Sequence, residues 1–184
     1  MTLPPLLPPG GDSWSPRQAQ DWLASMPAGW SPGVGAVSDW LAVRWTWQMR
    51  AYESGLVPST RREWAAACIG YTDAMVDRVG YEPWSAATDK ANLRAYVISR
   101  LGQVAGSHLW EAGCLIRDVE ATLALSVAEA TEMAGRWRTL PIPQILMLRR
   151  HKSLLTPLRQ VVDLVQATDR MAVDGWLAIR PQLP

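Results

Sequence analysis

The stretch from Asp89 to Gly135 is the least polar part of the chain, and it constrains the fold more than any other feature. Its apolar side chains recur at spacings of three and four residues, which places them on one side of a helix. They form two series: Leu93, Val97, Ile98, Leu101, Val104 and Leu109, then Leu115, Ile116, Val119, Leu123 and Val127. The stretch therefore predicts the central helical hairpin of an all-α fold.

Three polar or small residues lie within the first series. Gly102 and Gly106 are four residues apart on its flank, where a second helix could approach closely. His108 falls inside the apolar arc of the same helical wheel. We interpret His108 as a buried core histidine, and the alternative is a pH-sensitive contact.

Start and stop signals divide the rest of the chain into further helices. Ser15-Pro16 and Thr156-Pro157 each place a capping residue before a proline at the first helical position. Two capping boxes, at residues 60–63 and 126–129, predict further helix starts. The predicted helices cover residues 15–25, 37–53, 60–80, 126–138, 144–153 and 156–171. The helix over 60–80 should stop at Gly80, and one of its faces carries Trp64, Cys68, Tyr71, Met75 and Val79. In the helix over 156–171, Arg159 belongs to the polar face, and the residues expected to face inward are Leu158, Val161, Val162, Leu164, Val165 and Met171.

Two connectors separate these helices, and no strand is expected. Pro83-Trp84 should block continuation of the preceding helix, in a turn over residues 81–87. Residues 139–143 form the second connector, and the apolar tail from residue 173 onward should dock on the main body. Because no segment alternates with a period of two, no significant sheet is expected.

The chain length favours one domain. A chain of 184 residues can bury about 70% of its unfolded surface in a single core. We expect a single-domain bundle of six to eight helices over residues 14–184. Residues 1–13 contain four prolines and predict an extended leader, either disordered or docked on a neighbouring subunit.

The predicted helix over residues 37–53 has two apolar stripes. One consists of Val37, Leu41, Trp45, Met49 and Tyr52, and the other of Trp40, Val43 and Trp47. A helix that is apolar over most of its circumference is either buried in a bundle or contacts two bodies. Burial within this chain is one interpretation. The alternative makes Trp40, Val43 and Trp47 candidate partner-binding residues, since aromatic anchors dominate interface energetics.

The amino-acid composition indicates the base composition of the genome that encodes the chain. The chain has 16 Arg against 2 Lys, one Asn, no Phe and 11 Trp. Lys, Asn and Phe use AT-rich codons, so this usage indicates a GC-rich bacterium, its phage or its plasmid. Some tryptophans then occupy places where phenylalanine would otherwise stand, and their number alone does not indicate a binding site.

The chain lacks the residue patterns of common catalytic and metal sites. With two histidines it cannot supply the paired Glu-x-x-His motifs of a di-iron bundle. Cys68 and Cys114 stand alone, which favours small buried side chains over a disulfide or metal knuckle. Glu129 and Glu132 indicate a solvated acidic face. We therefore expect no catalytic residues, no metal and no cofactor, and we do not expect an enzyme.

One basic run interrupts an otherwise balanced charge pattern. Arg149, Arg150, His151 and Lys152 follow one another, although the net charge of the chain is only +1. Such a run can neutralise the phosphates of a nucleic acid or bind an acidic partner. Its cations can also simply complement the dipole at the end of a short helix.

These features lead to two functional hypotheses. No secretory signal and no apolar run long enough to cross a bilayer is evident, so a cytoplasmic protein is expected. The first hypothesis is a non-enzymatic adaptor or structural subunit that binds a protein partner or a second copy of itself. The second is a helical subunit that contacts nucleic acid through residues 149–152.

Overall fold

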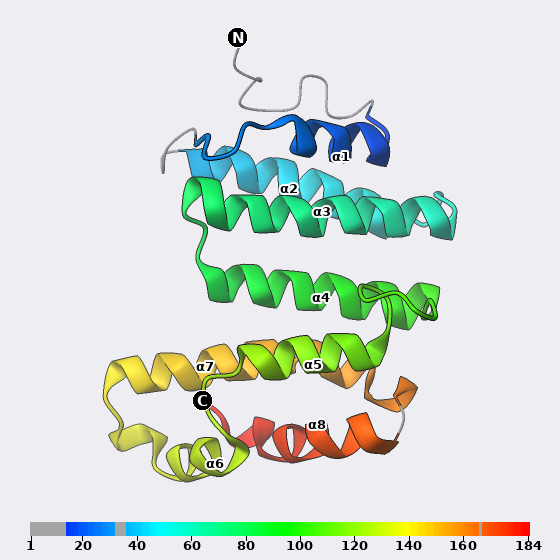
Figure 1. Cartoon of the computed structure of the whole chain (residues 1–184). Coiled ribbons are helices and arrows are strands. Elements are labelled where there is room, and N and C mark those ends of the chain that lie inside the picture. Colours follow the sequence, from blue (N-terminus) through cyan, green and yellow to red (C-terminus); the bar gives the residue numbers. More distant parts are fainter. Residues whose placement is uncertain (1–13, 32–35, 166) are drawn as a thin grey trace. The chain divides into compact units, whose positions relative to one another are not determined.

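The computed structural model describes residues 14–31, 36–165 and 167–184, and the predicted leader lies outside this part of the chain. The described residues contain eight α-helices and no strand, which confirms the all-α prediction. The helices are α1 (Pro16–Ser25), α2 (Val37–Tyr52), α3 (Pro58–Val79), α4 (Pro83–Leu101), α5 (Ala112–Thr122), α6 (Val127–Gly135), α7 (Ile142–Leu155) and α8 (Ala167–Ile179) (Figure 1). Among these residues, no helix is both long and apolar enough to cross a membrane.

The chain forms two compact units, Met1–Ala86 and Ala87–Pro184. Helix α4 begins in the first unit and lies mostly in the second. The predicted single domain over residues 14–184 stays a prediction.

In the first unit, α3 packs against both α1 and α2 (Figure 1). Its buried face carries the predicted residues Trp64, Cys68, Tyr71, Met75 and Val79. Helix α1 begins at a capping box between Ser15 and Gln18, as its Ser-Pro start indicated. The predicted end of α3 is confirmed as well, since Gly80 has a left-handed φ of 71° that suits glycine.

Two predicted helix boundaries in this unit are wrong, and both involve proline. Helix α3 begins at Pro58 rather than at Thr60, and Val57 is its N-cap without a side-chain hydrogen bond. Helix α4 begins at Pro83, within the segment 81–87 that was predicted to be a turn. In both cases the fixed φ of proline suits the first turn, where a missing N–H costs nothing.

In the second unit, α8 contacts α5 and α6. The 3₁₀ turns η4 (Pro157–Gln160), η5 (Val162–Leu164) and η6 (Arg180–Gln182) also pack in this unit, η4 against α7 and the other two against α8. The capping box at Ser126 is confirmed, because Ser126 Oγ accepts from the Glu129 N–H at 3.2 Å. The C-terminal tail docks as predicted, with Trp176, Ile179 and Leu183 buried.

The central hairpin departs from its predicted form. Helix α4 ends at Leu101, and Gly102 and Gly106 adopt positive φ angles of 82° and 75° in the connection to α5. They therefore terminate a helix and turn the chain, rather than admitting a second helix. Val104, predicted to be part of the apolar face, is 38% exposed in this connection.

The predicted helix over residues 156–171 is also wrong. Thr156 does not cap it, because its hydroxyl donates back to the Lys152 carbonyl at 2.9 Å in the last turn of α7. The segment that follows is η4 and η5, and α8 starts only at Ala167. Leu164 and Met171, predicted to face inward, are 45% and 78% exposed.

Candidate functional site

The structure decides between the two interpretations of the apolar stripes on α2. Trp40 and Trp47 are 0% and 1% exposed and lie in the core of the first unit, and Val43 is half-buried. The rings of Trp40 and Trp47 lie 5.0 and 4.9 Å from the ring of Tyr71 on α3. We therefore no longer assign Trp40 and Trp47 to a partner surface, since their faces are covered by this chain.

The other stripe of α2 is the one that reaches the surface. Trp45 is 60% exposed and Met49 is 47% exposed, although both were grouped with the more regular apolar series. They line a shallow hollow of about 600 Å³ together with other residues from the second half of α2 and the turn after it: Thr46, Arg50, Tyr52, Glu53 and Ser54. Arg50 and Glu53 form an ion pair of 3.0 Å at this hollow, so its polar rim is close to neutral.

The basic run does not form one continuous surface. Arg149 and Arg150 are exposed, whereas His151 is fully buried and its Nδ1 lies 2.8 Å from the Met147 carbonyl oxygen. Lys152 is half-buried, and its ammonium donates to the Leu183 carbonyl at 2.6 Å. Half of the run therefore holds the C-terminal tail and the core of the second unit, and only the two arginines face solvent.

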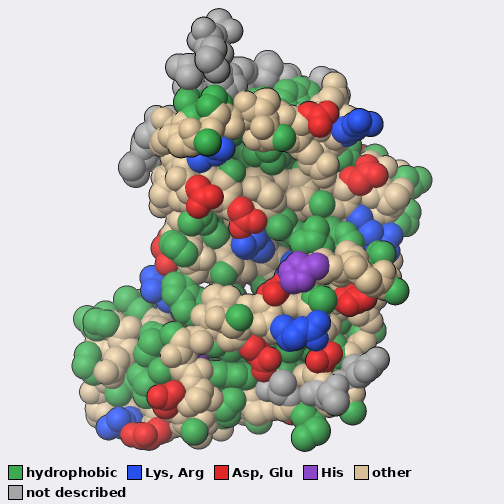
Figure 2. Space-filling view, viewed as in Figure 1, with side chains coloured by type: hydrophobic (Ala, Val, Ile, Leu, Met, Phe, Trp, Pro, Cys, Tyr) green, Lys and Arg blue, Asp and Glu red, His purple; other side chains and the backbone are tan. Residues whose placement is uncertain are grey.

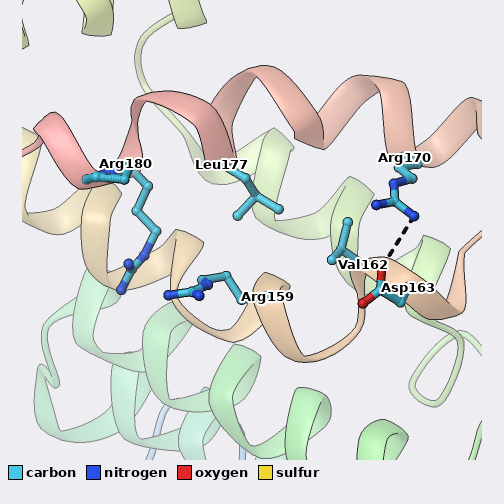
Figure 3. Close-up of a pocket in the computed structure, with 7 residues that line it drawn as sticks. Arg159, Val162, Asp163, Arg170, Leu177 and Arg180 are labelled. Carbon is cyan, nitrogen blue, oxygen red and sulfur yellow. Dashed lines mark ion pairs between the residues drawn. The ribbon is translucent and has the colours of Figure 1, made fainter.

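A cleft of about 460 Å³ lies between η4, η5, α8 and η6, all within the second unit. Its lining is part apolar and part charged, with three arginines and one aspartate: Arg159, Val162, Asp163, Arg170, Leu177, Arg180 and Pro181. Figure 3 shows Val162 and Leu177 between two charged ends. At one end Arg170 pairs with Asp163 at 3.3 Å and with Asp174 at 3.8 Å.

The other end of the cleft holds two arginines without acidic partners. Arg159 and Arg180 extend toward one another (Figure 3), and neither forms an ion pair with a described residue. Arg180 donates from Nη2 to the Thr156 hydroxyl at 2.8 Å, and its buried Nε has no acceptor among the described residues. Two like charges thus converge on one space, which makes that space favourable for an anion.

Sequence reasoning missed these two arginines. Arg159 was assigned to the polar face of a regular helix, and Arg180 was not singled out. They come together because η4 and η6, about twenty residues apart in the chain, line the same cleft. No local motif carries that information.

A second polar cluster surrounds the connection between α4 and α5. Arg94 is 6% exposed and donates to Asp118 at 2.6 Å, to the His108 carbonyl at 2.8 Å and to the Leu109 carbonyl at 3.0 Å. The His108 side chain is 72% exposed, with its Nε2 3.4 Å from the Asp118 carboxylate. The predicted burial of His108 is wrong, because the helix that would have buried it ends at Leu101.

The remaining candidate residues show little that is reactive. Cys68 is buried and Cys114 is half-buried, and both are free thiols. Burial and the nearby Asp169 raise the pKa of Glu120, while hydrogen bonds from Ser126 lower the pKa of the exposed Glu129. Within the described residues, no group of three or more histidine, cysteine, aspartate or glutamate side chains is placed to hold a metal ion.

Comparisons with protein-family models, with curated proteins and with solved structures find no match to this chain.

Proposed function

We propose that this chain is a non-enzymatic helical adaptor or structural subunit of a larger multiprotein assembly. We further propose that it acts in the cytoplasm of a GC-rich bacterium, or in its phage or plasmid. The observation that carries the proposal is the hollow beside the exposed Trp45 and Met49 on α2. Tryptophan, methionine and tyrosine are enriched in protein interfaces, and tryptophan is among the residues that contribute most to binding energy there.

The chemistry of the hollow indicates the kind of partner. Its rim carries one cation and one anion that are already paired, so it offers no net charge to attract a strongly charged molecule. Its apolar part is the indole of Trp45 with the side chain of Met49, whose thioether adapts to differently shaped groups. The occupant that fits is an uncharged apolar side chain presented by another protein.

The non-enzymatic part of the proposal rests on the residue patterns. The sequence contains no nucleophile–base motif, no phosphate-binding loop and no paired metal-ligand motif. We assign no catalytic residue and no cofactor. Native mass spectrometry of the purified protein tests this part, and a bound cofactor would contradict it.

The main test compares two exposed apolar residues of the first unit. Trp45 lines the hollow, whereas Val57 is 61% exposed and lies outside it. The partner is identified by co-purification and then reconstituted with the purified chain, and binding is measured by calorimetry. Trp45→Ser should weaken binding about 30-fold or more, and Val57→Ser should change it less than threefold.

Two results would contradict the proposal. One is equal affinity of wild type and the Trp45→Ser variant for the reconstituted partner. The other is a wild-type chain that stays monomeric and retains no protein under conditions that preserve complexes. Self-association of the wild type that is lost in Trp45→Ser would identify the partner as a second copy.

Nucleic-acid contact is the second candidate function, and the exposure of Arg149 and Arg150 favours it. Acidic and basic side chains are interspersed on the face shown in Figure 2, which offers little long-range attraction to phosphate. Changing Arg149 and Arg150 to Ala should flatten the salt dependence of nucleic-acid binding by about two units. Lys152 and His151 are left in place in this test, because they hold the tail and the core.

A further inference from the structure

We propose that the cleft of the second unit is a binding site for an aliphatic carboxylate. The site consists of Arg159 and Arg180 at one end and of Val162, Leu177 and Pro181 beside them. The inference concerns a different unit and different residues from the Trp45 hollow, and it does not depend on the proposed function.

The charge at the arginine end supports an anionic ligand. The guanidinium groups of Arg159 and Arg180 extend toward one another (Figure 3) and have no acidic partner among the described residues. Arg170, the third arginine of the cleft, is by contrast already paired with Asp163 and Asp174. An anion placed between Arg159 and Arg180 would remove their mutual repulsion.

Arg180 is partly positioned for this role before a ligand arrives. Its Nη2 donates to the Thr156 hydroxyl at 2.8 Å, which restricts the guanidinium to one orientation. Because a hydroxyl carries no charge, this bond leaves the positive charge of Arg180 unneutralised. The planar fork of an arginine fits the two oxygens of a carboxylate, and a second arginine provides donors from another direction.

The apolar residues distinguish a carboxylate with an aliphatic group from a bare anion. Val162 and Leu177 lie between the two charged ends (Figure 3), and Pro181 completes the lining. The volume of about 460 Å³ lies in the range of sites that enclose small ligands. A phosphate of a nucleic acid would leave these apolar groups uncovered, whereas an aliphatic chain would cover them.

This chemistry has two sources, a free aliphatic acid and the C-terminal carboxylate of a peptide that ends in leucine. The probes are octanoate, 1-octanol, inorganic phosphate, and a peptide ending in leucine with either a free or an amidated C-terminus. Calorimetry on the full chain measures each of them. Octanoate should bind and 1-octanol should not, because only octanoate can engage the two guanidinium groups.

Substitutions test whether Arg159 and Arg180 bind the ligand, and loss of an exposed arginine outside the cleft serves as the control. Arg159→Gln and Arg180→Gln should each weaken octanoate binding about tenfold or more. Arg149→Gln removes one exposed positive charge outside the cleft and should leave binding within about twofold. Leu177→Asn should weaken octanoate without creating a preference for phosphate. Arg159 is exposed, so its variant stays informative even if Arg180→Gln loses stability through its Thr156 contact.

The remaining outcomes either distinguish a free acid from a protein C-terminus as the ligand or contradict the proposed carboxylate site. Tighter binding of the free peptide than of octanoate, abolished by amidation, would identify a protein C-terminus, and the reverse order would identify a free acid. Absence of octanoate and peptide binding to wild type would overturn the inference. So would equal weakening by Arg149→Gln and Arg159→Gln, or inorganic phosphate binding as tightly as octanoate. Trp45→Ser should leave octanoate binding unchanged, which separates this test from that of the proposed function.

Discussion

The core of the first unit consists largely of aromatic side chains that pack on one another, whereas the core of the second unit is mostly aliphatic and borders the buried Arg94, which binds backbone carbonyls. In the first unit, the ring of Tyr71 contacts Trp22, Trp40 and Trp47 at 6.1, 5.0 and 4.9 Å. In the second unit, Arg94 and Lys152 donate to the carbonyls of a helix connection and of the C-terminal tail. Irregular segments in both units leave carbonyls that need donors, and in the first unit Arg61 and Arg78 supply them.

This difference predicts which substitutions should destabilise each unit. An aromatic core loses stability through cavities, because each large ring fills a volume that its neighbours cannot occupy. A segment held by a buried arginine loses stability when that donor is removed, because several acceptors are left unsatisfied at once. Substitutions in the two units should therefore differ in size and in cause.

The largest effect is expected at the centre of the aromatic core. Trp47→Ala should lower the free energy of unfolding by about 3–5 kcal/mol, because a fully buried indole leaves a cavity. Urea unfolding followed by far-UV circular dichroism measures it. Trp45→Ala on the same helix is the control and should cost less than about 1 kcal/mol, since Trp45 is 60% exposed. Equal losses would mean that the core does not depend on this stripe.

The second-largest loss of stability is expected at Arg94, which binds the carbonyls of the connection between α4 and α5. Arg94→Met should cost about 2–3 kcal/mol, because the His108 and Leu109 carbonyls and Asp118 lose a common donor. Urea unfolding and hydrogen exchange of the residues between α4 and α5 measure the change. Asp118→Asn should cost less, because its side chain is 40% exposed and both carbonyl contacts of Arg94 remain. A larger loss in Asp118→Asn than in Arg94→Met would contradict this explanation.

A smaller, pH-dependent effect is expected from His151. Burial lowers its pKa, and the hydrogen bond to the Met147 carbonyl opposes this shift only in part. Since the folded state then binds the proton less readily than the unfolded state, stability should fall as the pH drops below about 6.5, toward the folded pKa. A titrating proton changes stability by at most about 1.4 kcal/mol per pH unit.

Urea midpoints of the wild type and of the His151→Gln variant, measured between about pH 5 and 8, check this effect. This range spans the usual histidine pKa of about 6.5. The difference between the two proteins should shrink as the pH falls, because the variant has no proton to take up at this position. Parallel midpoints over the whole range would show that His151 does not titrate differently in the folded protein.

The smallest effects compare two predicted capping boxes, one in each unit. Ser126→Ala should cost about 1 kcal/mol, because Ser126 Oγ accepts from the Glu129 N–H. Thr60→Ala should have almost no effect, because α3 starts at Pro58 and Thr60 lies inside its first turn. Thermal unfolding resolves the difference. Destabilisation by Thr60→Ala equal to that of Ser126→Ala would restore Thr60 as the helix start.

Local patterns predicted the fold class and many of the helices. Spacings of three and four residues located the buried faces of α3 and α5, and the stop at Gly80 and the cap at Ser126 were identified from short motifs. These features depend on residues within one or two turns of a helix, so a single sequence contains them. Errors arose where two local signals competed, as at Pro83, where proline can either end a helix or begin one.

The candidate sites could be predicted only in part. The sequence identified α2 as a helix with two apolar stripes, but not which stripe faces outward. Val37, Leu41, Trp45, Met49 and Tyr52 had the more regular spacing, yet Trp40 and Trp47 are the residues that meet Tyr71. Similarly, adjacency in the chain made residues 149–152 look like one basic patch, although their side chains point to different surroundings.

The sequence by itself determined that the chain is helical, that α2 is apolar on two sides, and that common catalytic motifs are missing. The tertiary structure alone decided which tryptophans are exposed, that Arg94 supports the connection after α4, and that Arg159 and Arg180 share one cleft. The physical reason is the range of the interactions. Helix formation depends on neighbours a few residues away, whereas burial and charge pairing depend on segments that meet only when the chain is folded.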